Sequence, residues 1–74
     1  MIYDYSMLSG KITEVFGTRG NFAKAIGLSE RSVSLKMNGK VSWTQSEITN
    51  ACRLLRIPEK KINCYFFAVK VQSV

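Results

Sequence analysis

Helix-capping and helix-ending residues divide the 74-residue chain into short segments, and their spacing strongly limits the folds that the chain can adopt. Ser, Thr and Asp begin helices by accepting hydrogen bonds from free N–H groups, and glycine ends them because it adopts left-handed backbone angles without strain. Between these signals apolar residues recur every three or four positions, which is the period of an amphipathic helix. The pattern therefore predicts an all-α domain of five short helices.

The fourth segment has the clearest start, because Thr44 is followed three residues later by Glu47 in a capping-box pattern. The five predicted helices run approximately between these residues: Asp4 and Gly17, Thr18 and Gly27, Ser29 and Asn38, Thr44 and Leu55, and Pro58 and Phe66. Apolar and polar residues then alternate along the tail, which is typical of extended chain. We therefore expect a helical domain over residues 1–66, followed by a tail over residues 67–74 that is either an arm or a β-strand paired with a second chain.

The second and third predicted helices are joined by a very short connection, so they must cross at a steep angle and touch. Ala23 is small where the helices approach each other, Gly27 can adopt the positive φ that the turn needs, and Val33 points back into the angle. A small residue, a glycine four positions later and a β-branched residue ten positions later form the spacing of a helix-turn-helix.

The chain is basic, with 11 Lys and Arg residues against 5 Asp and Glu, a net charge of +6 and an isoelectric point near 9.7. Residues 17–44 carry +4 of this charge, which favours an anionic partner such as nucleic acid or a lipid surface. There is no His, no close pair of carboxylates and no glycine-rich phosphate loop. We therefore expect no enzyme, metal site, cofactor or small-molecule ligand.

Two cysteines, Cys52 and Cys64, stand in apolar surroundings without the spacing of a zinc site, and we expect both to be buried free thiols. No leader sequence or apolar run long enough for a membrane span is visible. These features predict a cytoplasmic protein without a membrane partner.

The third predicted helix should present a polar face outward when its residues are placed about 100° apart around Val33 as the inward pole. That face suits the major groove of DNA, where an arginine pairs with guanine and a leucine finds the thymine methyl group. Glu30 either accepts from a cytosine amino group or stabilises the first helical turn, and Ser29 is a cap as well as a contact. The predicted base-reading residues are Ser29, Glu30, Arg31, Ser34 and Leu35.

Phosphate contacts are expected from residues at the edges of this face, including the start of the second helix, where free N–H groups also attract an anion. These residues are Arg19, Asn21, Lys36, Asn38, Lys40 and Thr44. Trp43 stands next to Thr44 and is more typical of a core residue than of a DNA contact.

The stretch NFAKAIGLSERSVSLKMNGK resembles the Cro/phage-repressor type of helix-turn-helix, particularly in its ending SLKMNGK. The resemblance covers roughly residues 5–66, and the whole chain is similar to small Cro-like proteins from phages of Gram-positive bacteria. It implies a five-helix lambda-repressor-like fold whose second and third helices contact DNA. Two positions depart from the family pattern: Arg19 stands where glutamine is common, and Lys36 where the family usually has a buried apolar residue. We therefore expect Met37 to take over that packing.

The resemblance implies a sequence-specific regulator that binds a pseudo-palindromic double-stranded operator as a homodimer. The dimer contacts are expected where apolar residues exceed what so small a domain can bury, at Ile62, Tyr65, Phe66, Phe67, Val69 and Val71. An alternative is an antirepressor that keeps this fold but binds a repressor protein through Leu35 and the aromatic tail.

Overall fold

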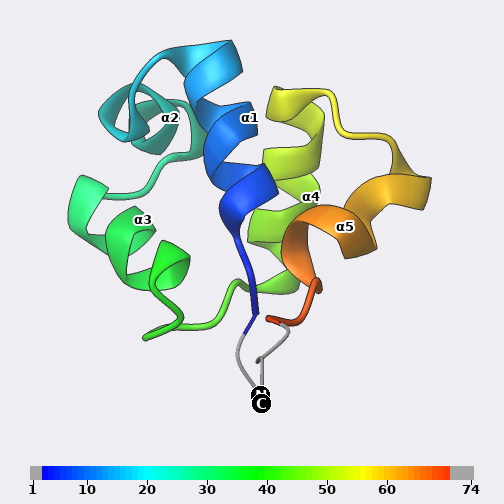
Figure 1. Ribbon diagram of the computed structural model, residues 1–74. Helices are drawn as coiled ribbons and strands as arrows, with labels where there is room; N and C mark the ends of the chain where they lie inside the picture. The colour runs from blue at the N-terminus through cyan, green and yellow to red at the C-terminus, as the bar shows by residue number, and fades with distance from the viewer. Residues whose placement is uncertain (1–2, 71–74) are drawn as a thin grey trace.

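The computed structural model describes residues 3–70 and confirms the predicted all-α fold (Figure 1). Its α-helices are α1 (Ser6–Phe16), α2 (Arg19–Ile26), α3 (Glu30–Met37), α4 (Gln45–Leu55) and α5 (Ile62–Phe66), and a 3-10 helix, η1 (Glu59–Lys61), precedes α5. Helix α1 packs against α2, α4 and α5, while α2 also contacts α3 and α4. The helices therefore surround one shared core.

The predicted caps of α2, α3 and α4 are all present. The hydroxyl of Thr18 accepts a hydrogen bond from the Asn21 N–H, at 3.1 Å, and Ser29 accepts one from the Ser32 N–H, at 3.0 Å. At α4 the capping box is complete, because the Glu47 side chain also accepts a hydrogen bond from the Thr44 N–H, at 2.9 Å. Local hydrogen bonding thus fixes three helix starts where the capping pattern predicts them.

The first and last helices begin later than the sequence predicts. Helix α1 begins at Ser6, and the Asp4 carboxylate accepts hydrogen bonds from both the hydroxyl and the N–H of that residue. These bonds lower the pKa of Asp4. After Pro58 the chain forms the η1 turn before α5 begins at Ile62.

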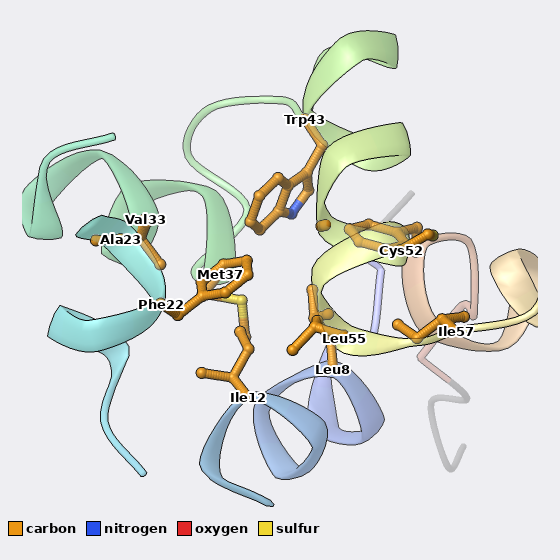
Figure 2. Close-up of a cluster of buried hydrophobic side chains, with 12 residues drawn as sticks. Leu8, Ile12, Phe22, Ala23, Val33, Met37, Trp43, Cys52, Leu55 and Ile57 are labelled. Carbon is orange, nitrogen blue, oxygen red and sulfur yellow. The ribbon is translucent and has the colours of Figure 1, made fainter. Parts of the chain in front are cut away.

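Apolar side chains from every α-helix meet in the core (Figure 2). Phe66 is 2% exposed and packs edge-on against Trp43, with ring centroids 5.5 Å apart. Trp43 is thus a core residue as expected, and within the described residues its indole N–H finds no hydrogen-bond acceptor. The buried hydrophobic residues are Leu8, Ile12, Phe22, Ala23, Val33, Met37, Trp43, Ala51, Cys52, Leu55, Ile57 and Phe66.

The two cysteines are free thiols, but only one of them is buried. Cys52 lies in the core, where burial raises the pKa of its thiol. Cys64 is exposed on α5, so the expectation that both are buried is wrong at this position. The short α5 turns Phe66 rather than Cys64 toward the core.

The segments that flank the helical domain lie side by side. Tyr3 and Val69 form an isolated antiparallel bridge, and the Asp4 N–H donates a hydrogen bond to the Ala68 carbonyl, at 2.6 Å. The rings of Tyr3 and Phe67 meet edge-on, with centroids 6.0 Å apart. The described part of the tail therefore pairs within its own chain, and Val71 lies outside the described residues.

Candidate functional site

The α2–turn–α3 unit has the geometry that its residue spacing predicts. Ala23 and Val33 are buried between the helices, with exposed fractions of 2% and 0%. Gly27 adopts a φ of 80°, and both Gly27 and Leu28 donate backbone hydrogen bonds to the Ala23 carbonyl. This tight turn holds α3 against α2 and leaves the opposite side of α3 free.

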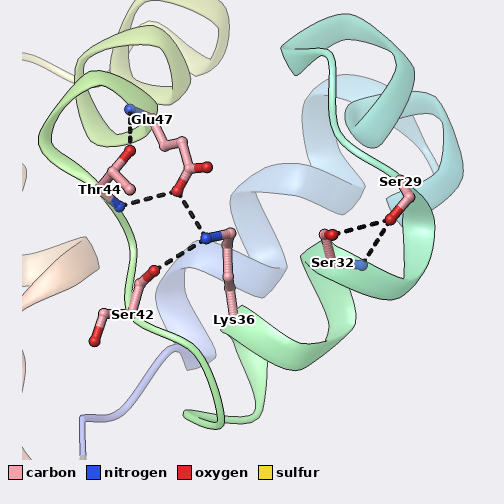
Figure 3. Close-up of polar contacts among 6 residues, drawn as sticks. All are labelled: Ser29, Ser32, Lys36, Ser42, Thr44 and Glu47. Atoms are coloured by element: carbon pink, nitrogen blue, oxygen red, sulfur yellow. Dashed lines mark hydrogen bonds and ion pairs between the residues drawn. The ribbon is translucent and has the colours of Figure 1, made fainter.

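The outer face of α3, with its N-terminal edge, carries the predicted base-reading residues. Arg31 is exposed, and Ser34 and Leu35 are half-buried. Ser29 and Glu30 are exposed at the N-terminal edge, where the Ser29 hydroxyl also donates a hydrogen bond to the Ser32 hydroxyl (Figure 3). We call Ser29, Glu30, Arg31, Ser34 and Leu35 the α3 face.

Glu30 reaches from α3 back to the first turn of α2. A methyl group added to Gly20 would contact the Glu30 carboxylate at 3.5 Å. Free N–H groups at the start of a helix attract negative charge, so the first turn of α2 offers the exposed carboxylate a favourable electrostatic environment within its own chain. This position supports the structural reading of Glu30 that the sequence left open.

Several predicted phosphate-binding residues have roles in the fold. The Asn21 amide donates a hydrogen bond to the Phe16 carbonyl, at 2.9 Å, and the Thr44 hydroxyl caps α4. Lys40 is exposed, whereas Arg19 is half-buried. Arg19 and Asn38 line one cleft of about 310 Å³ together with Tyr3, Asp4, Tyr5, Ser6, Ser9, Met37, Gly39 and Lys70. The structure thus brings Arg19 and Asn38 together at the edge of α3.

Lys36 is buried, which conflicts with its predicted phosphate contact. Its Nζ lies 2.8 Å from Glu47 Oε1 and donates a hydrogen bond to the Ser42 carbonyl, at 3.0 Å (Figure 3). The same Nζ stands 5.9 Å from the centre of the Trp43 ring. The Lys36 and Glu47 side chains are 7% and 19% exposed. Lys36 and Met37 are therefore both inward-facing, and the charge of Lys36 is neutralised by α4.

Glu47 is held in its charged form by this arrangement. Burial alone would raise the pKa of its carboxyl group, but hydrogen bonds from Lys36 and from the Thr44 N–H, together with the positive charge of Lys36, lower it overall. The sequence signal for this pair is the lysine at a position where the Cro-like proteins that the sequence resembles usually have an apolar residue.

The predicted dimer residues divide into buried and exposed groups. Phe66 belongs to the core and is not available to a partner, so its predicted interface role is wrong. Ile62 and Tyr65 are half-buried, while Phe67 and Val69 are 46% and 48% exposed. Dimerisation itself stays a prediction.

Phe67 and Val69 form an exposed apolar surface with a residue that the sequence analysis missed. Tyr3 is 38% exposed, contacts the Phe67 ring and lies opposite Val69. Its only sequence signal is that an aromatic residue precedes the first helix. We call Tyr3, Phe67 and Val69 the terminal patch.

Comparison with known proteins places the chain in a family. Residues 1–69 match the family described as "Protein of unknown function (DUF739)", and the chain belongs to this family. A solved structure that it resembles is the solution structure of the modulator of repression (MOR) of the temperate bacteriophage TP901-1 from Lactococcus lactis. The two chains are 56% identical, each is covered over 97% of its length, and the TM-score is 0.80. No curated protein matches the chain significantly.

Within the described residues, none of the helices combines the length and the apolar character that crossing a membrane requires.

Proposed function

We propose that this protein modulates phage repression by binding a repressor protein. The observation that carries the proposal is the 56% identity, over 97% of both chains, to a modulator of repression from a temperate phage. The proposal favours the antirepressor or interaction-protein reading of the sequence over the operator-binding one. A shared fold alone would not support it, because the same fold serves many functions.

The terminal patch suits a protein partner. Aromatic residues are enriched at the centres of protein interfaces, where they contribute much of the binding free energy. Tyr3 and Phe67 are fixed against each other by their edge-on contact, so binding would cost little side-chain entropy. The charged phosphates of a DNA backbone cannot pack favourably against such an apolar surface. We assign the terminal patch as the main contact with the repressor, with Leu35 of the α3 face as a further contact.

The test is the affinity of the purified chain for the purified repressor of the same phage genome, measured by isothermal titration calorimetry. Phe67→Ser should weaken binding by about 10- to 100-fold, since a central interface aromatic contributes roughly 1.4–2.8 kcal/mol. Val15→Ser is the matched control because Val15 is 43% exposed on α1 and lies outside the patch. The control should bind like the wild type.

The proposal fails if the wild-type chain does not bind the repressor. The assignment of the terminal patch fails if Phe67→Ser retains its circular dichroism spectrum and binds with unchanged affinity.

Direct operator binding is a second candidate function, favoured by the exposure of Arg31 on the α3 face and of Lys40 beside it. In this case affinity for duplex DNA should fall by orders of magnitude between low and moderate salt. Arg31→Ala should then cost about 1–3 kcal/mol and relax the preference at one base pair. Fluorescence anisotropy with selected and scrambled duplexes measures both effects. An unchanged sequence preference in Arg31→Ala would exclude Arg31 as a base reader.

A further inference from the structure

Four cations occur close together in the sequence at the corner where α4 leads into α5. Arg53, Arg56, Lys60 and Lys61 are all exposed, and Glu59 is the one acidic residue between them. Within residues 3–70 the ion pairs join Lys11 to Glu14 and Lys36 to Glu47, so none of these four cations is neutralised by an ion pair there. We call them the basic corner.

The backbone beneath the basic corner is ordered by hydrogen bonds. Ile57 is buried and its N–H donates a hydrogen bond to the Cys52 carbonyl, at 2.9 Å, while the Lys61 N–H donates one to the Pro58 carbonyl, at 2.8 Å. Figure 1 shows this connection at the end of α4 that lies away from α3. The charges are therefore presented on a fixed surface that is separate from the α3 face.

Arg56 has a backbone conformation that is unfavourable for a residue with a Cβ atom. Its φ is 56°, and the other residues with positive φ in the described chain are the glycines Gly17, Gly27 and Gly39. A left-handed conformation costs a residue with a Cβ roughly 1–2 kcal/mol. Strain of this kind is often retained where the side chain has a function. A glycine at this position would end α4 without strain. Helix termination therefore does not explain why the position carries an arginine.

The attraction between Arg53 or Arg56 and the C-terminal carbonyls of α4 is a partial reason. It does not account for the two lysines, which lie beyond the end of the helix in η1. The attraction is also worth only about 0.3–1 kcal/mol, which is less than the roughly 1–2 kcal/mol of strain that arginine adds relative to glycine at this position.

The composition of the basic corner indicates what it binds. The exposed large hydrophobic residues of the described chain all lie elsewhere, at Tyr3, Met7, Val15, Val41, Phe67 and Val69. Protein interfaces usually have an apolar or aromatic centre, whereas a phosphate backbone can be bound by Lys and Arg without any apolar residue. We propose that the basic corner binds the phosphate backbone of duplex DNA without reading its sequence. This proposal does not depend on repressor binding.

The test measures the affinity of the full chain for a mixed-sequence 20–30-base-pair duplex by fluorescence anisotropy over a range of salt concentrations. Lys60→Gln/Lys61→Gln should lower the slope of log affinity against log salt by about 1.8, since each phosphate contact contributes about 0.9. The matched control Lys11→Gln/Lys24→Gln removes the same charge from positions outside the corner and should change the slope much less.

The variant Arg56→Gly distinguishes a role of Arg56 in DNA binding from a role in the stability of the fold. It should weaken DNA binding and reduce the slope by about 0.9, while its melting temperature should rise because the backbone strain is relieved. A cation that served only the end of α4 would give the opposite pattern, with lower stability and unchanged DNA binding.

The proposal is overturned if the wild-type chain shows no DNA binding at low salt, or if the control variant loses as much slope as Lys60→Gln/Lys61→Gln. It is also overturned if the corner variants lose affinity for the repressor rather than for DNA, because the corner would then dock an acidic protein surface. The Phe67→Ser variant should keep the DNA affinity of the wild type, so the two proposals can fail separately.

Discussion

Replacing Phe66 with alanine is expected to lower the free energy of unfolding by about 4 kcal/mol, because a large ring is removed from a site that cannot collapse around the space it leaves. Phe66 is 2% exposed and its edge-on contact with Trp43 would be lost. Native proteins have total stabilities of roughly 0.05–0.15 kcal/mol per residue, so in a chain of 74 residues this loss is a large share of the total. Urea denaturation followed by circular dichroism measures the change.

Phe67→Ala is the matched control for this prediction. The two phenylalanines are adjacent, but Phe67 is 46% exposed, and its truncation should cost less than about 1 kcal/mol. Equal unfolding midpoints for the two variants would contradict the assignment of Phe66 to the core. Because Phe66 supports the fold, any effect of its replacement on a dimer would be a secondary result of unfolding.

Replacing Glu47 with alanine is expected to cost about 3 kcal/mol, because it leaves the buried Lys36 ammonium group without its partner. It also removes the acceptor for the Thr44 N–H at the start of α4. The matched variant is Lys36→Met/Glu47→Gln, which removes both charges and keeps an acceptor for the cap. We expect this double variant to lie within about 1 kcal/mol of the wild type. Thermal denaturation of the three proteins tests the comparison.

The same pair predicts how stability depends on pH. The folded-state pKa of Glu47 is lowered below its ordinary value of 4.5, so its contribution is fully present above that value and is lost as the pH falls through the lowered pKa. Lys36→Met/Glu47→Gln lacks this titration and should lose less stability between pH 5 and strongly acidic conditions. Parallel acid-unfolding curves for the wild type and the double variant would exclude the pair as a source of acid sensitivity.

The parts of the fold that local chemistry determines could be predicted from the sequence. The caps at Thr18, Ser29 and Thr44 depend on residues three positions away, and the turn at Gly27 depends on one backbone conformation. Neither requires knowledge of the tertiary structure.

The prediction was wrong where a distant partner decides the outcome. The sequence alone places Lys36 on the surface, whereas the fold brings Glu47 of α4 against its ammonium group. Phe66 and Phe67 are the same residue type, and the bounds of α5 decide between them: Phe66 is its last residue and is buried, whereas Phe67 follows the helix and is exposed. Tyr3 gains its place in the terminal patch from pairing with residues at the other end of the chain.

The kind of molecule that the protein binds is the property that the sequence determines least. Residue spacing indicated a helix-turn-helix and therefore favoured DNA, but the same α2–turn–α3 geometry can hold a surface for a protein. The match to a modulator of repression adds information that helix period and charge do not contain. The α3 face, the terminal patch and the basic corner are separate surfaces, so variants in each can be compared on one stable scaffold.

The bridge between Tyr3 and Val69 means that the polypeptide enters and leaves the domain at a single point. A unit with adjoining ends can be inserted into a loop of a host protein, or repeated in tandem through short linkers, without stretching its helices. A bulky group attached next to Tyr3 or Val69 would lie beside the terminal patch. Reporter groups for studies of repressor binding are therefore better attached at the exposed thiol of Cys64 than beside the terminal patch.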